Sequence, residues 1–395
     1  MKKDKLKALN DVVGKINKTY GAGTVMTAAD AVKAGKLTKR ILKTPSLELN
    51  QALWCGGLSG IVELFGPSGS GKTSLAIDTI VLNQKEDPDF IAAWLETEGS
   101  VTETILQDHG VDLDRLVYIR QEDVGNAESA LDILRGLINR EDLFNMIVVN
   151  SVAGLTPKKE SEDDLDKQNI ALIARTMSKF FRVATGDISK NNITAVFINQ
   201  VRDNVGQMFG DTAVTTGGKA LGFYADQRIR MNQLKIQAAD PIKEDEGVKV
   251  SFIIKKNRRA GVHNPFTKGQ YYARFDSGVD SIIPLPQMLL DAGIMEQKGA
   301  WWYYKDLGGN ILSVDGIEGK FASKNAFLDV LRTNKTWYDT MVGALLVNGK
   351  GAVESQTAFE VEESQAENAL NASLIAESED GIAEAYDGFD EDEQF

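Results

Sequence analysis

Cysteine and histidine are scarce in this sequence of 395 residues, which contains one cysteine and two histidines. The single Cys55 excludes a disulfide framework within the chain and is typical of a reducing compartment. So few ligands also argue against a structural zinc site. No apolar run reaches the roughly 18 residues that a membrane-spanning helix requires, and Lys5 and Asp11 interrupt any signal-peptide core. We therefore expect a cytoplasmic protein without membrane association.

Basic residues are absent from the end of the chain, because no lysine or arginine follows Lys350. Residues 354–393 contain 14 Asp and Glu residues, and removing them from the net charge of −13 leaves +1 for residues 1–353. The composition predicts a disordered acidic tail over residues 353–395. Two roles stay open for it: a solubilising segment, or an electrostatic competitor for a basic groove.

The first forty residues form a separate segment. Apolar residues at spacings of three and four predict an amphipathic helix over residues 3–20, which two glycines, at positions 21 and 23, then end. A polar stretch follows to about residue 40. A lone helix cannot bury its apolar face, so segment 1–40 either folds back on the core or docks on another copy of the chain.

Short apolar runs alternating with helical patterns predict an α/β core over residues 41–283, with a mostly parallel sheet flanked by helices. Two later runs, 248–256 and 270–275, have no helix between them and are expected to extend the sheet antiparallel. The pattern of residues 284–352 predicts a small α+β domain. The apolar runs that predict parallel strands are 61–65, 90–95, 116–119, 146–149 and 194–198.

The stretch GPSGSGKTS, residues 66–74, matches a complete phosphate-binding loop between a predicted strand and helix. Its glycines let backbone N–H groups face phosphates, and the following helix adds the positive end of its dipole. Lys72 is expected to reach the β- and γ-phosphates of ATP, and Thr73 to ligate Mg²⁺ directly. The residues of this loop are Gly66, Pro67, Ser68, Gly69, Ser70, Gly71, Lys72, Thr73 and Ser74.

Polar residues follow the next predicted strands, whose carboxyl ends face the ligand crevice in such sheets. Glu98, or failing that Glu96, is the candidate general base for hydrolysis, against the plainer interpretation of a surface glutamate. Asn150 stands where an acid normally holds the water shell of the metal; its amide can accept a hydrogen bond from such a water but carries no charge. Phe275 completes the residues expected at the nucleotide.

A third strand run ends at Gln200, whose amide could sense the γ-phosphate and pass its state to the long polar loop over about 201–220. On the preceding predicted helix, Arg175, Ser178 and Arg182 share one face. That face could bind nucleic-acid phosphates, or it could simply be solvated.

Several of these stretches together resemble the RecA family of DNA strand-exchange recombinases. The stretches are LTPKKE after MIVVNSVAG, FINQVRDNVGQMFG, TTGGKALGFYA and KGAWWYYKD. The similarity runs from about residue 3 to residue 345. Acidic C-terminal tails also occur in this family, and the divergence suggests a distant or phage-encoded member acting in a bacterial cell or an infected host.

The resemblance implies a helical filament on single-stranded DNA, with ATP between neighbouring subunits and the N-terminal helix packed on the next subunit. It makes Glu98 the catalytic glutamate and Gln200 the γ-phosphate sensor. Lys256 and Arg258 would reach the ATP of the neighbour. The DNA-facing loops would be about 158–170 and 201–218. The residues expected to contact DNA are Arg175, Ser178, Arg182, Arg202, Asn204, Gly217 and Gly218.

The sequence also departs from the family. Asn150 replaces an aspartate, and Asp203–Asn204 replaces a Met–Lys pair, so a cation is lost in the second DNA loop. Ile105 stands where a tyrosine usually stacks on adenine. The first loop is acidic, which predicts weaker or more salt-sensitive DNA binding.

The function predicted from the sequence is an ATP-dependent recombinase that pairs single-stranded DNA with a homologous duplex and hydrolyses ATP when DNA is bound. Loader or single-strand-binding proteins would be further partners. Two alternatives stay open: a DNA-binding scaffold that binds ATP with little hydrolysis, and a hexameric helicase-type motor on the same core.

Overall fold

The computed structural model describes residues 2–162, 172–203, 213–238, 240–306 and 308–348. The predicted acidic tail and Asn204 lie outside these residues. The chain divides into two compact units, Met1–Ser281 and Ile282–Phe395. Each unit is described by itself. Among the described residues, every helix is too short or too polar to cross a bilayer.

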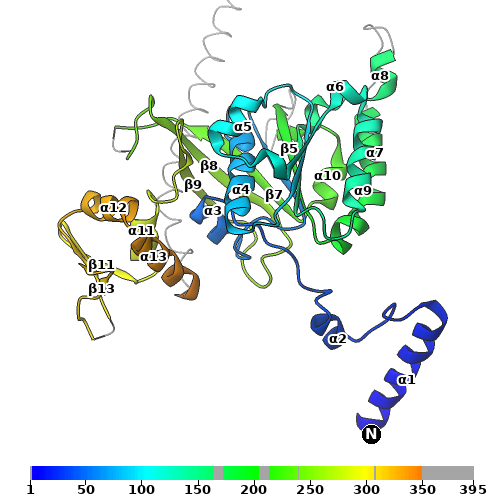
Figure 1. Ribbon diagram of the computed structural model, residues 1–395, viewed down its shortest axis with the longest axis horizontal. Coiled ribbons are helices and arrows are strands. Elements are labelled where there is room, and N and C mark those ends of the chain that lie inside the picture. The colour runs from blue at the N-terminus through cyan, green and yellow to red at the C-terminus, as the bar shows by residue number, and fades with distance from the viewer. Residues whose placement is uncertain (1, 163–171, 204–212, 239, 307, 349–395) are drawn as a thin grey trace, which may run out of the picture. The chain divides into compact units, whose positions relative to one another are not determined.

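The first unit is built on one large sheet with helices on both faces (Figure 1). Its strands lie in the order β10-β9-β8-β7-β1-β5-β4-β2-β3, and β6 pairs with β5. The six strands from β7 to β3 are parallel to one another. Their bounds are β1 Ile61–Gly66, β2 Ala92–Glu96, β3 Leu116–Arg120, β4 Met146–Asn150, β5 Thr194–Asp203 and β7 Gln227–Leu234.

Strands β1, β2, β4 and β5 are buried on both faces, which is why they read as continuous apolar runs in the sequence. Alternate residues of β5 enter two different core clusters: Val196 and Ile198 pack in one, and Ala195 and Phe197 in the other. Helices α4 and α5 cover the first face, and α7, α9 and α10 cover the second (Figure 1). These helices are α4 Lys72–Glu86, α5 Glu103–His109, α7 Ala127–Ile138, α9 Leu172–Lys190 and α10 Lys219–Tyr224.

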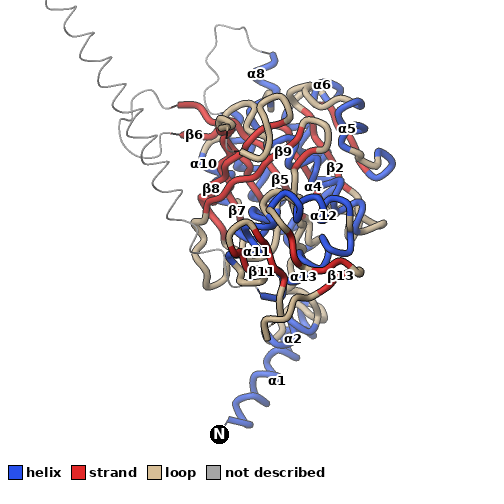
Figure 2. Tube along the Cα trace, turned by 90° about the vertical axis from the view of Figure 1, so that its left-hand side faces the viewer, coloured by secondary structure: helices blue, strands red, loops and turns tan. Residues whose placement is uncertain are grey.

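The antiparallel extension predicted from the sequence is confirmed: β8 (Gly247–Asn257) pairs with β7, and β9 (Lys268–Arg274) pairs with β8. Figure 2 shows these strands in red, turned by 90° from the first view. Strand β7 itself was not predicted. Its polar and apolar residues alternate, as in Arg228, Ile229 and Arg230, so it lacks the apolar run that marks the other parallel strands. The remaining short elements are α3 Leu47–Ala52, α6 Gln121–Val124, α8 Lys158–Glu162, β6 Ala213–Thr215 and β10 Gly278–Val279.

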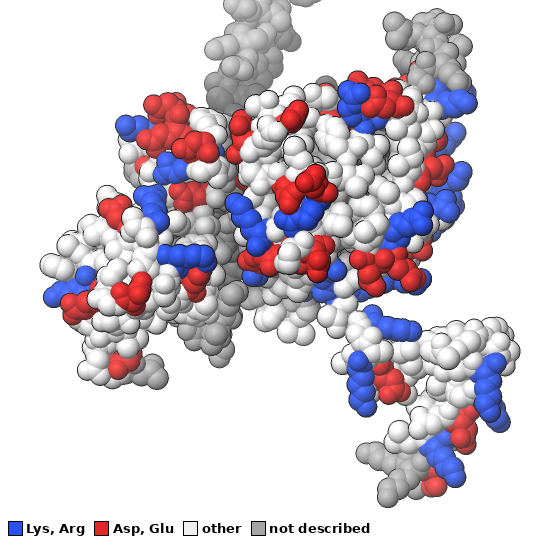
Figure 3. Space-filling model, in the orientation of Figure 1, with Lys and Arg blue, Asp and Glu red and all other residues white. Residues whose placement is uncertain are grey.

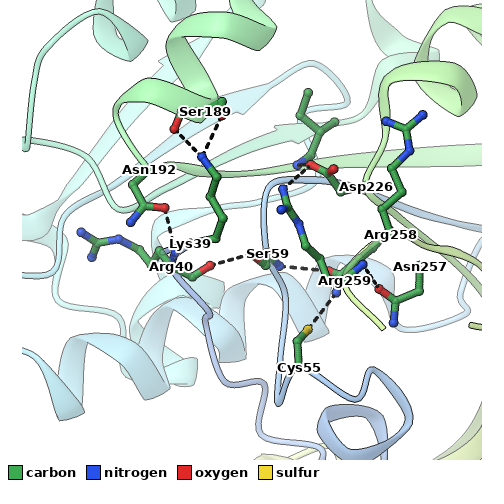
Figure 4. A network of polar contacts seen from close by, with 12 residues as sticks. Lys39, Arg40, Cys55, Ser59, Ser189, Asn192, Asp226, Asn257, Arg258 and Arg259 are labelled. Carbon is green, nitrogen blue, oxygen red and sulfur yellow. Dashed lines mark hydrogen bonds and ion pairs between the residues drawn. The ribbon is translucent and has the colours of Figure 1, made fainter. Parts of the chain in front are cut away.

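The N-terminal segment contains the predicted helix, α1 (Lys2–Tyr20), and a second short helix, α2 (Ala28–Lys33). The exposed fractions of Leu6 and Leu9 are 59% and 49%, so the described residues leave the apolar face of α1 largely uncovered. The segment joins the core at Lys39, whose Nζ donates to Ser189 O and Oγ, both at 2.8 Å (Figure 4).

The second unit is a small α+β domain, in agreement with the predicted fold class. A three-stranded antiparallel sheet and a two-stranded hairpin are followed by helices around Trp337, Phe321 and Phe327, whose rings pack together. Its elements are α11 Leu285–Asp291, β11 Met295–Lys298, β12 Trp301–Tyr304, β13 Ser313–Val314, β14 Ile317–Glu318, β15 Lys320–Phe321, α12 Lys324–Thr333 and α13 Lys335–Asn348.

Candidate nucleotide and nucleic-acid site

The predicted site residues that end the parallel strands lie at one edge of the sheet. Gly66, the last residue of β1, is opposite Gln200 of β5, and Glu96 of β2 is opposite Asn150 of β4. The loop 66–74 leaves β1 at this edge and enters α4 at Lys72. The parallel register therefore gathers side chains from four separate stretches of sequence around one loop.

Lys72 is buried within its own loop, and its ammonium group is surrounded by neutral acceptors. Nζ donates to Pro67 O at 2.6 Å, to Gly66 O at 3.1 Å and to Ser70 Oγ at 3.1 Å. Burial lowers the pKa of Lys72 to about 8, although nearby Glu98 acts in the opposite direction. A buried cation without a hydrogen-bonded carboxylate fits an anionic ligand such as a phosphate.

Thr73 and Asn150 lie next to each other, as expected for residues around a nucleotide-bound metal. Thr73 Oγ1 donates to Asn150 Oδ1 at 3.3 Å. The amide nitrogen of Asn150 donates in turn to Glu96 Oε2 at 2.9 Å. The described residues contain no group of three or more Asp, Glu, His or Cys that could hold a metal by themselves. This neutral donor set fits Mg²⁺ only when phosphates supply most of the negative charge.

The geometry separates the two candidate general bases. Glu96 is buried and its carboxylate is fully engaged: besides Asn150, it accepts from Trp94 Nε1 at 2.8 Å and from the backbone N–H groups of Glu98 and Ser100. These contacts fix the turn that follows β2. The carboxylate of Glu96 is therefore occupied by these hydrogen bonds, and Glu98 stays the candidate base.

Glu98 is exposed at the mouth of the site and lies beside Gln200. Its Oε1 accepts from Gln200 Nε2 at 2.9 Å and also from the hydroxyl of Ser151. Both groups that hold this carboxylate are therefore neutral donors. The contact with Gln200 joins the candidate base to the candidate sensor within one chain.

A cavity of about 400 Å³ connects these groups. Its lining includes the phosphate loop, Glu98 and Gln200, and also Phe275, an aromatic side chain that is 67% exposed. Sequence reasoning missed another lining residue, His109, because α5 gave no motif to mark it.

Asn199 connects β5, which carries the candidate sensor Gln200, to the predicted DNA loop. This buried side chain precedes Gln200, and its amide nitrogen donates to Thr216 O at 2.9 Å and to Glu63 Oε1 at 3.0 Å. Its Oδ1 accepts from the backbone N–H of Gln200 at 2.9 Å. A movement of Gln200 would therefore act directly on the residue before Gly217.

Four of the predicted DNA-binding residues come together next to α9. A Cβ atom at Gly218 would lie 2.7 Å from Ala174 Cβ, and one at Gly217 would lie 2.8 Å from Val152 Cγ1 and 3.7 Å from Met177 Cγ. Only glycine lets the loop backbone approach Ala174 and Met177 so closely, and Arg175 and Ser178 are the residues that follow these two on α9.

Both arginines on this face of α9 are exposed. Neither Arg175 nor Arg182 forms an ion pair with another described residue. Arg202 lies on β5, but nothing is described of its side chain, and Asn204 lies outside the described residues. Basic and acidic side chains are interspersed over the face shown in Figure 3.

Lys256 and Arg258 lie far from the phosphate loop of their own chain. Lys256 Nζ donates to Gly222 O and Phe223 O at the end of α10, and Arg258 also donates to Phe223 O. Arg258 N–H donates to Asp226 O, and Asp226 N–H to Ile61 O, which begins β1. The phosphate loop follows the other end of β1, about 16 Å away. Within one chain, these two cations are not brought to the nucleotide site.

Comparisons with known proteins agree on one family. The family described as RecA N-terminal domain matches residues 7–280. Protein RecA of Clostridioides difficile is 37% identical over 305 residues, 77% of this chain and 84% of that protein. Protein RecA of Bacteroides thetaiotaomicron is 38% identical over 306 residues, 77% of this chain and 88% of that protein. The solved RadB recombinase structure, at 19% identity and a TM-score of 0.46 over 60% of this chain and 98% of that chain, is too distant to add to this.

Proposed function

Because this chain belongs to the RecA family, we propose that it is an ATP-dependent DNA recombinase whose ATP hydrolysis depends on DNA. It forms a helical filament on single-stranded DNA and pairs that strand with a homologous duplex. The observation that carries this proposal is the contact path at one edge of the sheet. Glu98 touches Gln200, and Asn199 ties the backbone of Gln200 to Thr216 in the glycine turn beside α9.

The nucleotide is ATP with Mg²⁺. When bound, it supplies the phosphoanhydride bond that is hydrolysed and the charge that the site detects. The backbone of loop 66–74 and Lys72 would hold the phosphates, Thr73 would ligate the metal, and Asn150 would accept a hydrogen bond from one of its waters. Phe275 lies at the mouth of the same cavity. This arrangement needs no metal cage made of protein carboxylates.

The residues of this chain do three things in turn. Glu98 accepts a proton from the attacking water, in a position fixed by Ser151 and by the turn that Glu96 holds. Gln200, which contacts Glu98 in the nucleotide-free protein, would be free to contact a bound nucleotide instead. Asn199 then shifts the turn at Thr216 and with it the surface that binds DNA.

A second copy completes the site. Lys256 and Arg258 lie at the sheet edge opposite their own phosphate loop, so they serve the nucleotide of a neighbour, where they stabilise charge that develops during hydrolysis. The uncovered apolar residues of α1 support docking of the N-terminal helix on that neighbour. Hydrolysis then depends on assembly, and assembly on DNA.

The partners and the cellular location are proposed on the same grounds. Single-stranded DNA, a homologous duplex and other copies of the chain are the partners, and loader or single-strand-binding proteins assist them. The single cysteine fits the cytoplasm of a bacterial cell or a phage-infected host. The scaffold alternative rests on Asn150, which leaves the metal site without one charge.

Measurement of ATP turnover with and without single-stranded DNA tests this function. We expect a rate stimulated by DNA and abolished by Glu98→Gln, with ATP binding retained. Binding without turnover in either condition would instead support the scaffold. A rate that rises with translocation along DNA by a closed hexameric ring would support the motor.

A further inference from the structure

His109 and Asp78 form a partly buried pair at the nucleotide cavity that the proposed mechanism does not use. His109 Nδ1 lies 2.5 Å from Asp78 Oδ1, and the side chains are 22% and 10% exposed. Because a carboxylate only accepts, the Nδ1–H group donates. The imidazole ring lines the cavity that also contains the phosphate loop.

Asp78 fixes this ring through contacts that join three elements, α4, α5 and β10. It lies on α4, six residues after Lys72, and binds His109 of α5. Its Oδ2 accepts from the backbone N–H of Val279 in β10 at 3.1 Å. A Cβ atom at Gly278 would lie 2.6 Å from Oδ2, so β10 also packs directly against the carboxylate. The imidazole is therefore held in one orientation.

Two parts of the cavity lining differ in chemistry. Glu98 and Gln200 contact each other on the cavity lining, whereas His109 and Gly278 both lie against Asp78. Asp78 lies about 9 Å along α4 from Lys72, at 1.5 Å per residue. That distance suits the part of a nucleotide that follows its phosphates.

The contact with Asp78 uses Nδ1 of His109 and leaves the other ring nitrogen, Nε2, available. Among the described residues, Nε2 has no hydrogen-bond partner. The hydrogen bond with Asp78 raises the pKa of His109 above its ordinary value, although burial opposes this. Ile105, one turn earlier on α5, packs against the core instead of lining the cavity.

We propose that His109, oriented by Asp78, contacts the base of the bound nucleotide, with Phe275 as the second aromatic surface at the cavity mouth. Its ring packs against the face of the base. His109 is thus the residue by which this chain distinguishes a nucleotide from a bare polyphosphate. The inference rests on the proposed ATP-dependent function and concerns the same site.

Binding of ATP and of inorganic tripolyphosphate by the full-length protein tests this inference. His109→Ala should weaken ATP binding at least about fivefold, as loss of a base–aromatic contact does, and leave tripolyphosphate binding within about twofold. The other histidine, His263, stacks on Trp54 and does not line the cavity, so His263→Ala is the matched control and should leave both affinities unchanged.

Two results would overturn the inference: unchanged ATP binding by His109→Ala, or equal weakening of both ligands, which would mean a structural role. If His109→Ala fails to fold, proton NMR of the unmodified protein decides, because the chain has two histidines and His263→Ala assigns them. Saturating ATP must shift the His109 ring signals more than saturating tripolyphosphate does; equal shifts would refute the contact. Failure of the unmodified protein to bind either ligand would instead refute the proposed function itself.

Discussion

Asn150 donates its amide hydrogen to Glu96 at 2.9 Å, and both side chains are buried at the edge of the sheet that holds the nucleotide site. The same amide accepts from Thr73. Asn150 carries no charge, yet its amide donates a hydrogen bond to the buried carboxylate of Glu96. Its effect is therefore more than the loss of a charge from the proposed metal site. Glu96 in turn fixes the turn that carries Glu98.

Asn150→Asp should destabilise the nucleotide-free protein by roughly 2 kcal/mol at pH 7, because it places a second carboxylate against Glu96. The pair would share a proton, so the folded state would bind more protons than the unfolded one. The loss should therefore grow as the pH rises from about 4 to 7. Denaturant unfolding at both pH values checks this.

The double variant Glu96→Gln/Asn150→Asp is the control, because it restores one carboxylate and one amide in exchanged positions. It should recover most of the lost stability. A single variant as stable as the parent protein at pH 7 would show that Asn150 does not serve to satisfy Glu96.

Nucleotide binding should take up protons through Lys72. Burial lowers its pKa to about 8 in the nucleotide-free protein, and bound phosphates should raise that pKa towards the ordinary value. At pH 8, Lys72 should therefore take up about half a proton when ADP binds; at pH 6.5 it should take up almost none, and the partly protonated terminal phosphate of ADP should instead release protons. Calorimetry in buffers of different ionisation enthalpy measures the uptake. Equal uptake at both pH values would contradict this reading of the loop.

Gly218→Ala should weaken binding of single-stranded DNA at least tenfold and leave ATP binding intact. Gly218 has φ +74°, and an added Cβ would lie 2.7 Å from Ala174, so the turn must move away from α9. Gly186, which lies on α9 itself, is the control, because an added Cβ there meets no atom within 4 Å. Fluorescence anisotropy with a labelled oligonucleotide measures the affinity. Equal DNA binding by both variants would remove this turn from the DNA site.

Much of the core was predictable because its signals are local. The phosphate loop carries its own spacing, and strands buried on both faces read as apolar runs, as in β4 (Met146–Asn150). Strand β7 escaped prediction because its alternating Arg228, Ile229 and Arg230 resemble an exposed segment. Its place between β1 and β8 depends on sheet order, which no local pattern contains.

The site was predictable where strand ends mark it and unpredictable where folding joins distant residues. Glu98, Asn150 and Gln200 each follow an apolar run. The sequence alone could not decide between Glu96 and Glu98 as the candidate base. The structure distinguishes them because the carboxylate of Glu96 is buried and occupied by hydrogen bonds. The pairing of His109 with Asp78 joins two helices and has no signature in the sequence.

A mixing experiment tests most directly whether each ATPase site is built from two copies of the chain. Glu98→Gln and the double variant Lys256→Ala/Arg258→Ala should each lack DNA-stimulated hydrolysis. In an equal mixture on single-stranded DNA, random head-to-tail assembly makes about one junction in four intact. We predict recovery of about a quarter of the unmodified rate. A mixture as inactive as its two components would show that the cations of one chain do not complete the site of its neighbour.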